Sequence, residues 1–342
     1  MKRLTAFLAC LTLGALSLQA LEVKEGLVKL IVNETNGYIS FYKLIDVAKA
    51  SYEALLFDSD PRTSFPTLSA DGRLYRLGDS AEFRVKVSRT DSGVRIEYRS
   101  SSFVVTQSLD FAKSSGSALA DGLRVGFTLE NLSERETALG LRYLLDTWLG
   151  EKSGVHFATD KRARIAEETA ILPTDEDSWL SSPGDKASFM IQLSGSGIDR
   201  PDRVLLSNWK RLSDAPWGFD ANPQRNFTLI PYSINDSAVA LFWEPAAVVR
   251  GGSRSISFAM GNFNDKGYAL ASAKTQTDQI FENTVLGQAA PDKATSMATD
   301  LIAVRDLIER IDRAIAEGNI SPDELAAWRK ILDRLEERKK GY

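Results

Sequence analysis

Residues 103–133, FVVTQSLDFAKSSGSALADGLRVGFTLENLS, decide the fold class of this chain. A β-rich run over 104–111 ends in a loop of Ser and Gly, and apolar and polar residues alternate over 123–129. A period of two is that of a strand with one buried and one wet face. The stretch therefore predicts two neighbouring strands that each cover a hydrophobic core.

The same pattern extends along the chain in both directions. Asn36-Gly37 separates two β-rich runs and is typical of a hairpin, because both residues tolerate positive φ. A second hairpin is predicted over 83–98, with Asp91-Ser92-Gly93 at its turn. Further strands are expected near 103–111, 139–149, 187–193, 203–209, 226–231, 237–243 and 254–260. Many short strands at this spacing predict a mainly β protein with a large antiparallel β-sandwich, and a short helix is expected only around 45–56.

The C-terminal part has a helical period instead. Leu301, Val304, Ile308, Ile311 and Ile315 recur at steps of three and four, which predicts one apolar stripe on a helix. Leu325, Trp328, Leu332 and Leu335 repeat the same steps after Gly318-Asn319, and Ser321-Pro322-Asp323-Glu324 forms a capping box. We therefore expect an α-helical hairpin over 296–340 that follows a β-sandwich domain (21–265) and a polar linker (266–295).

The N-terminus predicts export. Lys2 and Arg3 precede an uncharged, mostly apolar run, and Ala20 offers a small residue for cleavage. This is the layout of a signal peptide, here residues 1–20, and the run is too short for a comfortable membrane span. The expected location is periplasmic or extracellular. A lipoprotein anchored through Cys10 is the alternative.

Composition excludes several classes of function. The 342 residues are 43% hydrophobic and carry 42 Lys+Arg against 46 Asp+Glu, so no basic excess suggests a nucleic-acid partner. One Cys and one His cannot build a Cys/His zinc site or a disulfide. We therefore expect no metal, no cofactor and no transmembrane segment in the mature chain.

Residues 103–133 resemble the central strands of galactose-mutarotase-like β-sandwiches, because an alternating strand is closed there by Asn131-Leu132-Ser133. The runs 139–150 and 237–245 also resemble segments of uncharacterised exported bacterial β-sandwich proteins. The resemblance implies the sandwich fold. That family uses histidines and a glutamate for its chemistry. Because His156 is the single histidine of this chain, mutarotase chemistry is not expected here.

Two carboxylates stand in apolar strands. Asp146 follows Arg142 by four residues, and in a strand both share a face, so we expect a structural Arg–Asp contact there. Glu244 lies between Trp243 and Pro245, and with Asp146 it would make a glycosidase pair only if the two lie about 5–10 Å apart. His156 is expected to be an ordinary loop or strand-end residue. No catalytic residue is predicted.

Four aromatic residues between 209 and 243 define a candidate ligand or partner surface together with Asp146 and Glu244; they are Trp209, Trp217, Phe219 and Trp243. Tryptophan stacks on sugar rings and packs in cores equally readily, so core packing remains the alternative. The second candidate surface is the helical hairpin, with Leu301, Val304, Ile308, Ile311, Leu325, Trp328 and Leu332 as its docking residues.

The sequence thus favours an exported, non-enzymatic envelope protein with a structural or protein-interaction role. Its hairpin docks either on its own sandwich or on a partner, which is another envelope protein or a second copy. The alternative is a carbohydrate-binding or carbohydrate-processing module that uses the aromatic residues.

Overall fold

The computed structural model describes residues 20–268, 270, 293–317 and 322–340. The expected signal peptide up to residue 19, with Cys10, and most of the expected linker lie outside these residues. Among the described helices, none is both long and apolar enough to cross a membrane.

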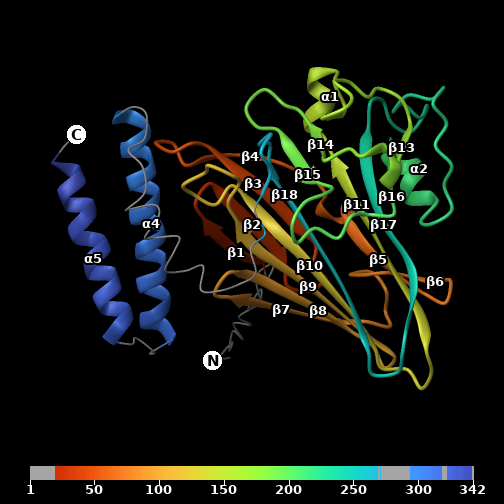
Figure 1. Ribbon diagram of the computed structural model, residues 1–342, viewed down its shortest axis with the longest axis horizontal. Helices are drawn as coiled ribbons and strands as arrows, with labels where there is room; N and C mark the ends of the chain where they lie inside the picture. The colour runs from red at the N-terminus through yellow and green to blue at the C-terminus, as the bar shows by residue number, and fades with distance from the viewer. Residues whose placement is uncertain (1–19, 269, 271–292, 318–321, 341–342) are drawn as a thin grey trace, which may run out of the picture.

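Three antiparallel sheets make up residues 20–262 (Figure 1). The first sheet is β1 (Ala20–Glu25), β2 (Val28–Asn33), β3 (Ile39–Asp46) and β4 (Ser51–Ala54). The eight-stranded sheet has the order β12 (Ala158–Thr159), β14 (Trp179–Ser182), β15 (Phe189–Gln192), β18 (Ser253–Asn262), β10 (Gly122–Asn131), β9 (Phe103–Ala112), β8 (Gly93–Arg99) and β7 (Arg84–Thr90). The six-stranded sheet has the order β13 (Thr169–Ile171), β16 (Arg203–Asn208), β17 (Ser237–Val248), β11 (Thr137–Thr147), β5 (Phe65–Ala70) and β6 (Arg73–Arg76).

The main core lies between the eight-stranded and six-stranded sheets. Phe127 of one sheet packs edge-on against Tyr143 of the other, with ring centroids 5.5 Å apart, and Trp243 packs on Phe258 at 5.4 Å. Gln107 donates a hydrogen bond of 3.2 Å across the core to the hydroxyl of Tyr143. The mainly β, antiparallel sandwich predicted from the sequence is confirmed.

The short helices lie in connections. They are η1 (Pro61–Thr63), α1 (Leu149–Ser153), η2 (Pro173–Asp175) and α2 (Trp209–Asp214). At the other end of the molecule, α4 (Lys293–Glu317) and α5 (Pro322–Lys339) lie beside the sheet of β1 to β4 (Figure 1).

Two local predictions are wrong. Residues 45–56 form the end of β3 and all of β4, because cross-strand pairing with β3 takes up a segment whose own helical preference is weak. Residues 226–231 form no strand and are held by isolated bridges such as Leu229 with Ser233. In addition, α4 begins at Lys293, and Tyr268 and Leu270 are buried although they fall in the expected linker.

Candidate functional site

The outer face of the six-stranded sheet, turned away from the main core, holds most of the candidate residues. The pleat of β11 sends Leu141, Tyr143 and Leu145 into the core. The alternate residues of the strand, Arg142 and Asp146 among them, therefore lie on the outer face. Over this face lie α2 and the segment that follows it.

Three carboxylates meet at one end of this face. Asp146 lies near the end of β11, Glu151 lies in α1, and Asp236 directly precedes β17. Because Asp146 stands opposite Ala238 in register, the start of β17 is brought beside the end of β11. The carboxylate oxygens of the three residues lie within 4.8 Å of one another. We call these three residues the carboxylate cluster.

Burial dominates the electrostatics of the carboxylate cluster. Removal from water raises the pKa of Asp146 to about 7 and that of Glu151 to about 8, and it also raises the pKa of Asp236. The Ser237 N–H, which donates to Glu151 Oε1 at 2.8 Å, offsets part of this effect. In the part of the chain that the structure describes, no ion pair joins these carboxylates to Lys or Arg.

Two kinds of chemistry are open to such a cluster. Carboxylate oxygens are ligands for Ca²⁺ or Mg²⁺. Carboxyl groups that keep protons near neutral pH also donate and accept protons. The sequence predicted no metal site, and only Asp146 of the three residues was a candidate.

His156 lies outside this cluster. Its ring packs against Phe227, with centroids 4.6 Å apart, and is buried. Burial and the charge of Arg164 lower the pKa of His156, so the imidazole is neutral at pH 7. Its Nδ1 has no hydrogen-bond partner among the described residues.

Three of the four candidate aromatic residues lie over the outer face. Trp209, Trp217 and Phe219 are half-buried and pack on the cluster around Phe242. The indole N–H of Trp209 donates to the carbonyl of Thr63 at 2.9 Å. Trp243 instead points into the main core, where its indole N–H donates to the carbonyl of Asp199 at 2.8 Å.

Glu244 is hydrogen-bonded to one of these aromatic residues. It accepts hydrogen bonds from Arg203 at 3.0 Å and from the indole of Trp217 at 3.1 Å. Asp146 lies opposite Ala238, six residues away from Glu244 along β17, which is about 20 Å at the rise of a strand. The structure therefore does not bring Asp146 and Glu244 together at the separation of a glycosidase pair.

The expected contact between Arg142 and Asp146 is not formed. Four residues along a strand span about 13 Å, which is beyond the reach of a direct ion pair. Arg142 instead donates from Nη2 to the carbonyl of Leu212 at 2.8 Å. Asp146 belongs to the carboxylate cluster.

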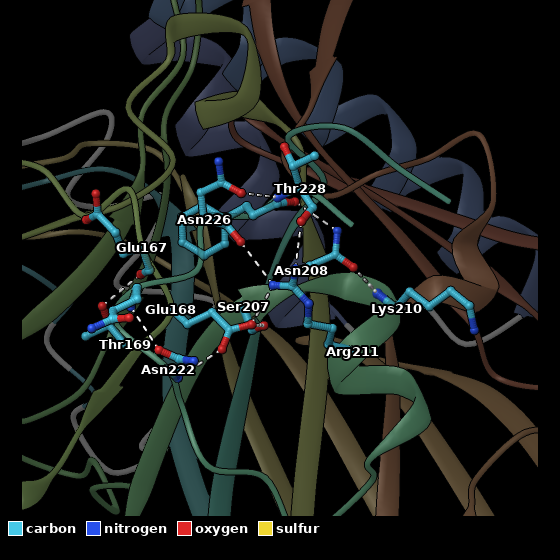
Figure 2. A network of polar contacts seen from close by, with 12 residues as sticks. Glu167, Glu168, Thr169, Ser207, Asn208, Lys210, Arg211, Asn222, Asn226 and Thr228 are labelled. Atoms are coloured by element: carbon cyan, nitrogen blue, oxygen red, sulfur yellow. Dashed lines mark hydrogen bonds and ion pairs between the residues drawn. The ribbon is translucent and has the colours of Figure 1, made fainter. Parts of the chain in front are cut away.

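A buried polar network fixes the loop over residues 222–236 (Figure 2). Glu168, fully buried, accepts from Arg211 at 2.6 Å, from the hydroxyl of Ser207 at 2.7 Å and from the Asn222 N–H at 3.0 Å. Arg211 also donates to the carbonyl of Thr228 at 2.7 Å. Sequence reasoning missed Glu168, because nothing in the polar stretch around it indicates burial.

The second candidate surface is the helical hairpin, and α4 holds it against the first sheet. Arg305 donates to the carbonyl of Gly26 at 2.9 Å and to the hydroxyl of Tyr52 at 3.2 Å, while Asp306 accepts from the Gly26 N–H at 2.8 Å. Ile302 packs with Leu44 and other residues of a small apolar cluster beside the first sheet.

This docking leaves the predicted apolar stripe of the hairpin largely in solvent. Leu301, Ile308 and Ile315 of α4 are 55%, 53% and 62% exposed, and Leu325 and Leu332 of α5 are 50% and 43% exposed. Val304, Ile311 and Trp328 are half-buried. These eight residues are called the hairpin seam below.

No family model and no curated protein matches the chain. Among solved structures, a candidate aldose 1-epimerase from Escherichia coli matches at 11% identity and a TM-score of 0.47, over 72% of this chain and 99% of that one. A galactose mutarotase-like protein from Lactobacillus casei matches at 10% identity and 0.45, over 72% and 100%. A TPR-domain containing protein from Parabacteroides distasonis matches at 9% and 0.46, over 94% and 69%. The likeness in each case is one of overall fold alone.

Proposed function

We propose that this protein is an exported, non-enzymatic interaction protein whose hairpin seam pairs with the seam of a second copy. The observation that carries the proposal is the exposure of the seam. Five of its large apolar side chains are 43% or more exposed, three of them on α4 and two on α5. Large apolar side chains that are exposed together on a protein surface mark an interaction site.

The spacing of the seam favours a helical partner. Leu301, Ile308 and Ile315 lie seven residues apart, with Val304 and Ile311 between them, which is the a/d pattern of a helix that packs on other helices. Leu325 and Leu332 continue the same interval on α5. Two hairpins related by a two-fold axis would bury both seams as a four-helix bundle. The opposite side of α4 is already used against the first sheet.

Sedimentation of the full chain over a range of concentrations tests this proposal. The double variant Ile308→Gln/Leu332→Gln should weaken self-association at least tenfold, about 1.4 kcal/mol, because each side chain loses its buried position. The control is Asp333→Asn/Glu337→Gln, at two exposed positions of α5 outside the seam.

A wild-type chain that stays monomeric at all concentrations would contradict self-association. If another helical protein then copurifies with the wild type and not with the seam variant, the interaction role would stand with a different occupant.

Export is tested separately. The protein isolated from its native cell should begin near Leu21. An N-terminus at Met1 would contradict export, and a lipidated Cys10 would replace the soluble form with an anchored one.

Saccharide binding is the second candidate function. Half-buried Trp209, Trp217 and Phe219 gather beside ionisable side chains on the outer face, and such aromatic rings stack on sugars. Trp217→Ala should then abolish retention on a polysaccharide that the wild type binds. Trp179→Ala, a half-buried tryptophan away from this face, is the control.

A further inference from the structure

A row of three arginines crosses the outer face of the six-stranded sheet. The residues stand opposite one another on neighbouring strands, in the order Arg76, Thr67, Arg142, Phe242 and Arg203. Residues that are directly opposite in an antiparallel sheet share a face, with Cβ atoms about 5 Å apart. The row therefore concentrates positive charge in the middle of a largely apolar face.

Arg142 is the centre of this row and is fully buried. Its Nη2 donates to the carbonyl of Leu212, while Nε and Nη1 find no hydrogen-bond partner among the residues that the structure describes. The hydroxyl of Thr67, directly opposite, is also buried and has no hydrogen-bond partner within the described part of the chain. Buried donors are nearly always satisfied in native proteins, so unpaired ones at adjacent positions indicate a missing acceptor.

The neighbours of Arg142 do not supply that acceptor. Arg203 is paired with Glu244 at 3.0 Å, and Arg76 is paired with Asp79 at 2.8 Å. Among the described residues, no carboxylate forms an ion pair with Arg142. Burial and the two neighbouring arginines lower the pKa of Arg142 to about 9, so the side chain is still a cation at neutral pH.

Stacking on Phe242 does not replace an anion either. The guanidinium of Arg142 lies 5.6 Å from the ring centroid, whereas that of Arg203 lies at 4.3 Å from the same ring. One ring is thus shared by two cations. A buried charge needs an opposite charge with good hydrogen-bond geometry.

We infer that Arg142 and Thr67 bind an anionic oxygen group of a small ligand, either a carboxylate or a tetrahedral phosphate or sulfate. The free Nε and Nη1 donate to the ligand oxygens, and the Thr67 hydroxyl adds a third donor. Trp217 and Phe219 lie over the row and would contact the remainder of the ligand. This site is independent of the hairpin seam and does not rest on self-association.

Calorimetric titration of the full chain tests the site and separates the two classes of anion. Acetate and glucuronate represent carboxylates, and phosphate and sulfate represent tetrahedral anions, while glucose is the uncharged control. One class should bind saturably with one site per chain. Binding should weaken at least tenfold in Thr67→Val, which keeps the side-chain shape, and should be lost in Arg142→Met.

Arg73→Met is the matched control, because Arg73 is an exposed arginine on the same strand as Arg76 and is paired with Glu82. In anion-free buffer, Arg142→Met should also unfold at a higher temperature than the wild type, because it removes a buried, uncompensated charge.

The inference is overturned if none of the four anions binds saturably to the wild type, or if binding survives in Arg142→Met. If Arg142→Met does not fold, the comparison of Thr67→Val with the wild type decides. Equal affinity in these two proteins would also overturn the site.

Discussion

Glu168 shows how one side chain holds a long loop on the sheet. It is fully buried and paired with Arg211, which in turn holds the carbonyls of Asn226 and Thr228. Removing one partner of a buried pair leaves the other charge uncompensated, which typically costs 3–5 kcal/mol. We expect Glu168→Ala to lower the free energy of unfolding by about 3 kcal/mol in urea titrations. Glu167→Ala, at the exposed neighbouring position, should change it by less than about 0.5 kcal/mol.

The carboxylate cluster predicts a pH dependence of stability. Because burial raises the pKa of Asp146 to about 7 and of Glu151 to about 8, the folded state holds more protons than the unfolded state between about pH 4 and pH 8. Stability supplied by these groups is therefore present at low pH and is lost as pH rises through 7 and 8. Thermal unfolding should accordingly show a falling melting temperature from pH 5 to pH 8.

Neutral variants distinguish the contribution of the carboxylate cluster to this pH dependence from that of other groups. Glu151→Gln should flatten the pH profile and raise stability at pH 8 by at least about 1.4 kcal/mol, which corresponds to one unit of pKa shift. The variant Glu176→Gln, at an exposed acidic position, should leave the profile unchanged. A wild-type profile that rises with pH over this range would contradict the buried cluster.

Part of the carboxylate cluster and its surroundings could be predicted from the sequence. Asp146 and Arg142 stand out as charged residues in an apolar run, and both lie on the outer face as the strand period requires. Asp236 could not be found, because it reaches Asp146 only through the pairing of β11 with β17, 90 residues apart. A strand pattern gives the face of a residue but not the partner strand.

At the scale of elements, prediction succeeded where local chemistry decides the structure. The turn at Asn36-Gly37 does join β2 to β3, and Gly37 has a φ of +77° that glycine adopts without strain. The helical stripe of α4 likewise follows from its period. Prediction failed at 45–56, where pairing with β3 and not local preference sets the structure.

The docking of α4 depends on a small number of polar contacts. The Gly26 N–H donates to Asp306, and the Gly26 carbonyl accepts from Arg305. Asp306→Ala leaves this buried N–H unsatisfied, which costs about 1–3 kcal/mol. We expect faster hydrogen exchange and faster proteolysis within 293–317 in this variant, with the sandwich unchanged. Asp312→Ala, at an exposed position of the same helix, should behave as the wild type.

At the scale of the whole molecule, the two candidate surfaces lie far apart. The outer face of the six-stranded sheet and the hairpin lie at opposite ends of the long axis (Figure 1). Of the residues that the structure describes, none beyond Met260 belongs to the main core, and Ile302 of the hairpin packs in a small cluster with Leu44 and Leu119. Binding at one surface therefore need not disturb the other.

This separation makes truncation the strongest test of the architecture. A chain that ends at residue 292 keeps both large sheets together with buried Tyr268 and Leu270. It should retain its β-type circular dichroism and unfold cooperatively, with a loss of about 3 kcal/mol for the contacts of Ile302 and Leu307. It should also remain monomeric at concentrations where the full chain self-associates, and it should bind anions at Arg142 with unchanged affinity.

A truncated chain that fails to fold would make the hairpin part of the core. A folded one that still dimerises would place the association surface on the sandwich.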